Sequence, residues 1–254
     1  MAQSHTPKAL YPSLDGATVF LTGGASGIGA EIVHGFVAQD AQVGFVDIDE
    51  DGGTAMAQAT GATHIAADLR DIDALKAAFA ALIEKLGAPK VLVNNAARDD
   101  RHAWEGVTEA YYDERIATNL KHAFFATQAC APAMIAAGQG GSIINMGSNS
   151  WWEATGGMPV YTGAKAAVHG MTRSFARDLG PHRIRVNTVV PGWIMTDRQK
   201  ELWVTEDALA AHLKTQCLPD PIAPREVAET VLFLASDAAN ACTASNFFVE
   251  AGSV

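Results

Sequence analysis

Tyr161 and Lys165 are the residues whose types and spacing most directly suggest chemistry. They lie four positions apart in an alanine-rich stretch that continues through Met171, Phe175 and Leu179, which predicts a helix with both side chains on one face. An ammonium group beside a phenol favours the phenolate, so Lys165 is expected to lower the pKa of Tyr161 from about 10. Such a phenol acts as a general base toward an alcohol. Taken alone, the spacing also fits an ordinary amphipathic helix with a solvated lysine.

A glycine-rich turn near the start of the chain predicts a nucleotide site. Residues 18–22 indicate a buried strand, the glycine-rich residues 23–29 follow at once, and residues 32–37 show a helical pattern. Glycines let the backbone approach a pyrophosphate, and the helix N-terminus supplies N–H donors and the positive end of a dipole. The alternative is a glycine-rich loop that binds no ligand.

An acidic residue ends the second predicted strand, residues 42–47. Asp47 lies 18 residues beyond Gly29, close to the offset of about 20 expected for the carboxylate that binds the adenosine ribose. A carboxylate there repels a 2′-phosphate, and residues 48–51 contain no Arg or Lys. This predicts NAD over NADP. The alternative is that Asp47 caps the next helix.

Ser148 ends the predicted strand 142–148, thirteen positions before Tyr161. Its hydroxyl is placed to bond a reacting substrate oxygen and to stabilise charge that develops there. Hydrolysis by a Ser-His-Asp triad is the rival interpretation, but no G-x-S-x-G motif surrounds this serine.

Two further stretches suggest a pocket for a polyol. Residues 98–102 are five polar residues beyond the carboxyl end of the predicted strand 91–97, where ligands bind in open α/β sheets. Carboxylates and guanidinium groups recognise several hydroxyls at once. Trp151 and Trp152 follow Ser148, and an aromatic ring packs well against a sugar. The alternatives are a solvated loop and a tryptophan pair used as core or subunit contact.

Composition excludes several classes of protein. The 254 residues are 48% hydrophobic and 18% charged, which suits one α/β domain with a full core. A net charge of −10 without a basic block argues against nucleic acid and anionic membranes. Residues 1–14 lack an apolar signal-peptide core, and no apolar run is long enough to span a bilayer. Three scattered cysteines predict reduced thiols in a cytoplasm, and no spacing predicts a metal site.

The element pattern predicts a doubly wound parallel sheet with helices on both faces, in a single domain over residues 1–254. Seven strands are expected, at 18–22, 42–47, 64–69, 91–97, 142–148, 185–190 and 247–249. Helices are expected over 73–86 and, as one long helix, over 111–134, where Asn119 is an unfavourable residue. Residues 1–13 form an N-terminal arm, and residues from 197 to about 220 form a substrate lid.

The motifs, taken together and in order, resemble the short-chain dehydrogenase/reductase family. They are the glycine turn in the spacing T-G-x-x-x-G-x-G, then Asn94-Asn95-Ala96-Ala97, Ser148, and Tyr161 with Lys165. The resemblance runs from about Leu14 to the C-terminus and implies a seven-stranded Rossmann domain that binds a nicotinamide cofactor. Three positions depart from the family pattern: Ala97 replaces a usual Gly, Gly147 a usual Ser, and Ala251 a Gly of the terminal D-G-G.

The resemblance assigns roles that the residues alone do not. Asn119 would distort its helix and hold a water in a proton relay to Lys165, which would also hold the nicotinamide ribose. Asp68 and Leu69 would flank the adenine, although Asp68 also fits an N-cap for the helix over 73–86. The implied cofactor-binding set is Gly23, Ser26, Gly27, Ile28, Gly29, Asp47, Ile48, Asp68, Leu69, Asn95, Ala96, Ala97, Tyr161, Lys165, Pro191, Gly192, Ile194 and Thr196.

Within the family, the chain is similar to bacterial aldose 1-dehydrogenases. The particular segments are 11–14, 99–102, 113–116, 119–122, 196–199 and 216–218. The implied reaction oxidises the anomeric hydroxyl of a pentose or hexose to a lactone with NAD. The expected substrate residues are Asp100, Arg101, Ser148, Trp151, Tyr161, Trp193 and Gln199. A homotetramer built on the helix of Tyr161 and the helix over 224–235 is also implied. The rivals are a dehydrogenase for non-sugar alcohols or ketones, a cofactor-binding regulator, and a structural subunit.

Overall fold

The computed structural model describes residues 8–253 and contains one seven-stranded parallel sheet. The strand order is β3-β2-β1-β4-β5-β6-β7, so the chain reverses direction between β1 and β4. The strands are β1 (Thr18–Thr22), β2 (Gln42–Asp47), β3 (Thr63–Ala66), β4 (Val91–Asn94), β5 (Gly141–Met146), β6 (Ile184–Pro191) and β7 (Asn246–Val249). This confirms the predicted doubly wound fold, and places the carboxyl ends of β1 and β4 side by side at the switch point where such folds bind ligands.

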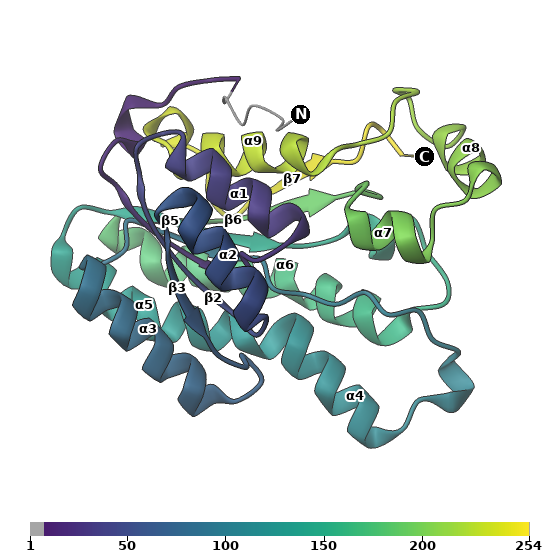
Figure 1. Ribbon diagram of the computed structural model, residues 1–254, viewed down its shortest axis with the longest axis horizontal. Helices are drawn as coiled ribbons and strands as arrows, with labels where there is room; N and C mark the ends of the chain where they lie inside the picture. The colour runs from purple at the N-terminus through teal and green to yellow at the C-terminus, as the bar shows by residue number, and fades with distance from the viewer. Residues whose placement is uncertain (1–7, 254) are drawn as a thin grey trace.

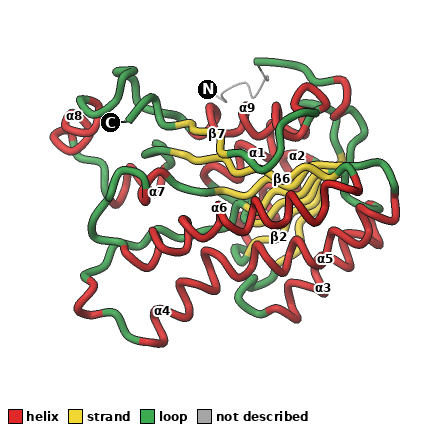
Figure 2. The backbone as a smooth tube through the Cα atoms, turned by 180° about the vertical axis from the view of Figure 1, so that it is seen from behind, coloured by secondary structure: helices red, strands yellow, loops and turns green. Residues whose placement is uncertain are grey.

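Helices cover both faces of the sheet (Figures 1 and 2). The helices are α1 (Gly27–Val37), α2 (Glu50–Thr60), α3 (Ile72–Leu86), α4 (Glu109–Ile116), α5 (His122–Ala137), α6 (Pro159–Leu179), α7 (Asp197–Leu202), α8 (Glu206–Leu213) and α9 (Pro224–Ala235). Helices α1 and α9 pack together on one face, while α3, α5 and α6 pack on the other. Helices α7 and α8 stand apart from these layers (Figure 1) and occupy most of the predicted lid.

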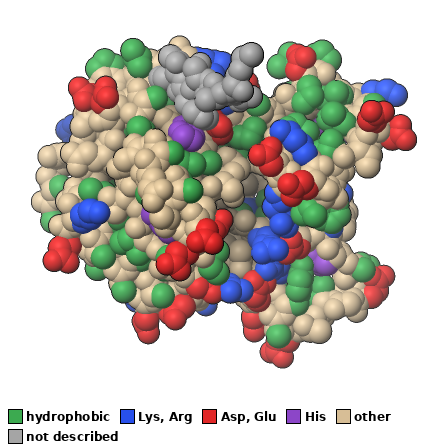
Figure 3. Space-filling model, viewed as in Figure 1, with side chains coloured by type: hydrophobic (Ala, Val, Ile, Leu, Met, Phe, Trp, Pro, Cys, Tyr) green, Lys and Arg blue, Asp and Glu red, His purple; other side chains and the backbone are tan. Residues whose placement is uncertain are grey.

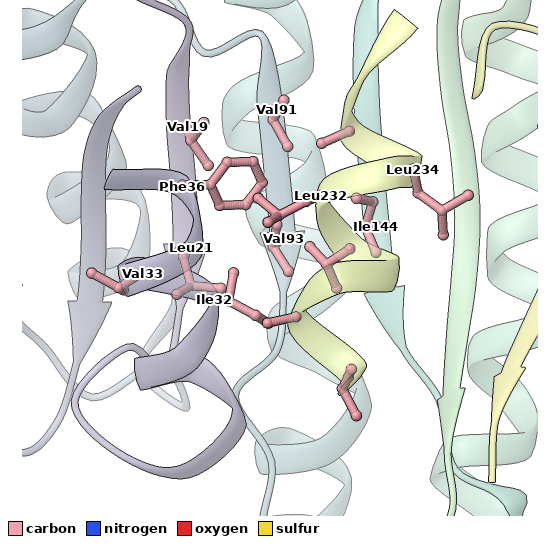
Figure 4. Close-up of a cluster of buried hydrophobic side chains, with 14 of the residues drawn as sticks. Val19, Leu21, Ile32, Val33, Phe36, Val91, Val93, Ile144, Leu232 and Leu234 are labelled. Carbon is pink, nitrogen blue, oxygen red and sulfur yellow. The ribbon is translucent and has the colours of Figure 1, made fainter. Parts of the chain in front are cut away.

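The core explains why the strands are apolar along their whole length. Both faces of a doubly wound sheet are covered, so successive side chains are buried in alternate directions. Leu21 points into the cluster between the sheet and helices α1 and α9, where Phe36 and Leu232 meet it (Figure 4), whereas Phe20 belongs to the cluster beneath α3 and α5. Phe20 and Leu21 are both fully buried. Packing on both faces fixes the sheet edge that carries the polar residues.

The expected helix over 111–134 is interrupted, which corrects its prediction as one regular helix. α4 ends at Ile116, a π-helical turn spans Ala117–Lys121, and α5 begins at His122. A π turn adds a residue to the helical turn and leaves part of the backbone ladder displaced. Asn119 lies within it, so the distortion implied by the family resemblance is present.

Other boundaries also differ from prediction. β3 ends at Ala66 and β4 at Asn94, so the residues expected to extend both strands lie in the following loops. α3 begins at Ile72, and its N-cap is Asp71, whose carboxylate accepts bonds from the backbone of Asp73 and Ala74. The alternative that Asp68 caps this helix is therefore wrong.

The N-terminal arm is only partly described, because residues 1–7 lie outside the described residues. Gln39 fixes the described part: its Oε1 accepts from the Tyr11 backbone at 2.8 Å, and its Nε2 donates to the Ala9 carbonyl at 2.7 Å. No helix within residues 8–253 is long and apolar enough to cross a membrane.

Candidate active site

The first turns of α6 carry Tyr161 and Lys165 to the carboxyl edge of the sheet. Pro159 occupies the first turn of the helix, where its missing N–H costs nothing. Lys165 is only 2% exposed, and its Nζ donates a hydrogen bond to the Met146 carbonyl at 2.8 Å. The same Nζ lies 5.8 Å from the centre of the Tyr161 ring. The end of β5 therefore holds the lysine in place beside the phenol.

Burial sets the protonation states of this pair. It lowers the pKa of Lys165 to about 8, and the nearby Asp99 carboxylate partly offsets that decrease. Burial also raises the pKa of Tyr161, and Asp99 raises it further, while a hydrogen bond from Ser148 acts in the opposite direction. The expectation that Lys165 brings the Tyr161 pKa below its ordinary value is therefore corrected: in this structure, desolvation of the phenolate outweighs the attraction of the ammonium group.

Ser148 lies just beyond β5 and faces Tyr161. Its side chain is hydrogen-bonded to Tyr161, and its Oγ also accepts from the Ser150 backbone N–H at 3.1 Å. Ser148 is 9% exposed and lines the same cavity as Tyr161. The two hydroxyl groups can thus bond one substrate oxygen from two directions.

Asn119 is buried behind this pair and does not line the cavity. Its Oδ1 accepts from the Arg98 backbone N–H at 2.8 Å, and its Nδ2 donates to the Arg115 carbonyl at 2.9 Å. The side chain therefore ties the loop after β4 to the π turn. The water relay to Lys165 remains a prediction.

A single cavity of about 900 Å³ runs along the carboxyl edge of the sheet, and Figure 3 shows the hollow opening on one face of the molecule. Each of the eighteen residues expected to bind the cofactor lines it. Two glycines make room in the predicted phosphate turn. A Cβ on Gly29 would lie 1.7 Å from the Gly23 carbonyl oxygen, and Gly23 itself has a φ of +74° and abuts Ala96. The turn thus fits a dinucleotide, whose pyrophosphate requires close approach of the backbone.

Asp47 is held by backbone groups at the end of β2. Its Oδ2 accepts from the Ala25 N–H at 2.9 Å, and its Oδ1 accepts from the Asp49 N–H at 3.0 Å. Asp49 is the residue that caps α2, through a 2.9 Å bond from the Gly52 N–H. The alternative that Asp47 is the helix cap is wrong, and its carboxylate lines the cavity at the position expected for a ribose contact.

The expected substrate residues divide into two groups. Arg101, Trp193 and Gln199 line the cavity together with Ser148 and Tyr161. The Trp193 Nε1 donates to the Gln199 Oε1 at 2.9 Å, which orients both side chains.

Trp151 and Asp100 do not line the cavity, which corrects both assignments. The Trp151 indole donates to the His169 Nε2 at 2.8 Å and packs edge-on against Trp152, which is 65% exposed. The Asp100 carboxylate is turned toward the guanidinium group of Arg115, at 2.7 Å.

Four other side chains line the substrate end and were not predicted as site residues: Asp99, Glu153, Trp203 and His212. Asp99 lies beside Asp100 in the sequence, and only the turn of the loop decides which carboxylate faces the cavity. Trp203 and His212 belong to the lid, whose fold leaves no short motif. A polar lid with an isolated tryptophan is the one signal that would have suggested Trp203.

Comparison with known proteins agrees with this geometry. A family model described as enoyl-(acyl carrier protein) reductase matches residues 23–253. The chain is 48% identical to the D-xylose 1-dehydrogenase of Caulobacter vibrioides over 249 residues, covering 96% of this chain and 98% of the relative. It is 44% identical to the probable galactose dehydrogenase of Rhizobium meliloti, over 97% and 98% of the two chains. A mutant short-chain dehydrogenase/reductase of Serratia marcescens matches with a TM-score of 0.88, 32% identity, and 94% and 98% coverage.

The matched family model, these full-length relatives and the nucleotide-shaped cleft lead to one conclusion. The chain is an oxidoreductase that belongs to the short-chain dehydrogenase/reductase family.

Proposed function

We propose that this enzyme oxidises the anomeric hydroxyl of a pentose or hexose to its lactone and transfers the hydride to NAD. The observation that carries the proposal is the layout of the cavity. Tyr161 and Ser148 lie beside the turn expected to hold the nicotinamide, and the adjoining end of the cavity is lined by polar groups such as Asp99, Glu153 and Gln199. A polyol satisfies such groups, whereas a steroid or acyl chain would leave them unpaired. The names of the two sugar dehydrogenases support the same class of substrate.

In this account, the protein's own residues position the alcohol and move its proton. Ser148 donates a hydrogen bond to the reacting oxygen, and Tyr161 removes the hydroxyl proton as the carbonyl forms. Lys165, held by the Met146 carbonyl, stabilises the negative charge on the phenol oxygen and binds the nicotinamide ribose. Asn119 completes the proposed path for the proton to solvent. The nicotinamide, when bound, supplies the hydride acceptor.

The choice of NAD rests on Asp47. Its carboxylate lines the cavity at the end of β2, where it would accept bonds from ribose hydroxyls and repel a 2′-phosphate. The next residue on the cavity wall, Ile48, supplies no positive charge that could compensate.

Sugar oxidation is expected to become faster as the pH rises through the neutral range. The raised pKa of Tyr161 means that the protonated phenol predominates at neutral pH, so the phenolate needed as base increases with pH, by up to tenfold per unit. The reverse reduction uses the protonated phenol and is expected to be flat over that range. Steady-state rates in both directions from pH 6 to 10 test this. An oxidation rate that is already constant at pH 6 would contradict it.

The direct test of the proposed reaction uses an aldose with deuterium in place of hydrogen at C1. Oxidation of the anomeric carbon transfers that deuterium to the nicotinamide and slows the hydride step, and NMR of the products is expected to show deuterated NADH together with an aldonolactone. NADH without deuterium would mean that another carbinol is oxidised. That outcome would overturn the anomeric assignment while leaving the enzyme a dehydrogenase.

The homotetramer implied by the family resemblance is part of the proposal. α6 and α9 would form its interfaces, and light scattering after size exclusion is expected to give four times the chain mass of 26.7 kDa.

A further inference from the structure

Three consecutive residues of the loop after β4 each contact the lid. The Asp99 Oδ2 accepts from the Gln199 Nε2 at 2.7 Å, the Asp100 Oδ1 accepts from the Arg198 Nη2 at 2.5 Å, and the Arg101 guanidinium carbon lies 4.8 Å from the centre of the Trp203 ring. Arg198 and Gln199 belong to α7, and Trp203 is its C-cap. The whole of α7 is thus held against one short loop.

Asp100 is the member of this loop that is also fixed to the body of the protein. Its Oδ2 accepts from the Arg115 Nη1 at 2.7 Å and lies 3.0 Å from the Arg98 Nε. The Arg115 side chain is 8% exposed on α4, so it is a rigid anchor, whereas the Arg198 side chain is 41% exposed on the lid. One carboxylate therefore joins a buried cation of the core to a mobile cation of the lid.

The ion pairs continue from Arg115 to the other end of the cavity. Arg115 pairs with Glu114, the Arg70 Nη1 lies 2.8 Å from the Glu114 Oε1, and the Arg70 Nη2 lies 2.6 Å from the Asp68 Oδ2. Asp68 lines the wall expected to hold the adenine. Alternating charges thus run from the adenine wall to the lid, and Figure 3 shows acidic and basic side chains interspersed along this hollow.

We propose that Asp100 is a positioning residue that holds the lid over bound sugar by pairing with Arg198. Asp100 does not line the cavity and so acts through α7, whose Gln199 and neighbouring Trp203 do line it. The proposal rests on the proposed function, since it concerns how the same site retains its sugar. Both partners are partly exposed, so the pair is screened by salt.

The test combines Asp100→Asn, Arg198→Met and the double variant with saturating NAD and a neutral aldose. Each single variant is expected to raise the KM for the sugar about fivefold with a smaller change in kcat, and the double variant is expected to be no worse than either one. Additive effects of the two substitutions would overturn the pairing. Unchanged KM values in both single variants would overturn the positioning role.

Salt gives a readout that a merely structural role would not move. In the parent enzyme, KM is expected to rise between about 0.1 M and 1 M salt, over which the Debye length falls from about 10 Å to about 3 Å. In Asp100→Asn, KM is expected to be high and nearly independent of salt. Asp113→Asn, which removes an exposed carboxylate from α4, is the matched control and should behave as the parent. A salt dependence that persists in Asp100→Asn would contradict the proposal.

Proteolysis separates failure of this proposal from failure of the proposed function, because it needs no substrate. Trypsin cleavage after Lys200 and Lys214, at the two ends of the lid, is expected to be faster in Asp100→Asn than in the parent or in Asp113→Asn. Equal cleavage rates would overturn the latch even if sugar turnover is normal. Faster cleavage together with no turnover of any aldose would support the latch and remove the sugar assignment.

Discussion

Tyr161→Phe is expected to lower kcat by about a thousandfold, the contribution of a well-placed general base. The substitution removes only the phenol oxygen, so α6 and the Lys165 bond to the Met146 carbonyl should remain. NAD binding, followed by fluorescence titration, is expected to change little. Single-turnover rates measured with saturating NAD and sugar would show that the chemical step is the one affected.

Tyr112→Phe is the matched control for this loss. Tyr112 lies on α4, is 49% exposed and does not line the cavity, so its phenol oxygen should not matter to turnover. If Tyr161→Phe kept more than about a tenth of parental kcat, the general-base role would be wrong and Ser148 or a bound water would have to take the proton.

The second large effect is expected from Asp47→Ala combined with Ile48→Arg. The pair of changes removes the carboxylate that would repel a 2′-phosphate and adds a guanidinium group that can bind it. The ratio of kcat/KM for NADP to that for NAD is expected to rise by about a hundredfold or more, the scale on which a buried charge contact is gained or lost. The measurement is NADH and NADPH formation with one sugar at saturation.

Asp51→Asn controls for the loss of a carboxylate near the cofactor cleft. It lies exposed on α2 and outside the cavity, so the cofactor ratio should stay at the parental value. A parental preference for NADP, or no change in the double variant, would show that Asp47 does not read the 2′ position. The Ala25 bond would then leave it a structural role.

The cofactor end of the site could be predicted from sequence because its contacts are made by backbone and short side chains at strand ends. Glycine spacing, an acid at the end of β2 and small residues after β4 follow from local geometry that any parallel sheet imposes. All eighteen predicted residues therefore lie on one cavity wall. The position of Asn119 in a distorted helix followed from family resemblance, since an asparagine alone does not specify a π turn.

The substrate end could not be predicted as well, because it depends on how two loops turn. Asp99 and Asp100 have the same chemistry and adjacent positions, yet one faces the cavity and the other an arginine of α4. Trp151 lies near Ser148 in sequence but bonds His169 on the outer side of α6. The pKa of Tyr161 failed for a related reason, since the spacing of two residues says nothing of how deeply both are buried.

The central claim is that this chain oxidises an aldose with NAD through Tyr161. The most direct measurement is NADH formation with a panel of pentoses and hexoses, with NAD and NADP side by side, in the parent and in Tyr161→Phe. The account predicts turnover of at least one aldose with NAD that is lost in the Phe variant. No turnover of any sugar by a protein that still binds NAD would contradict it, and would direct attention to secondary alcohols and ketones.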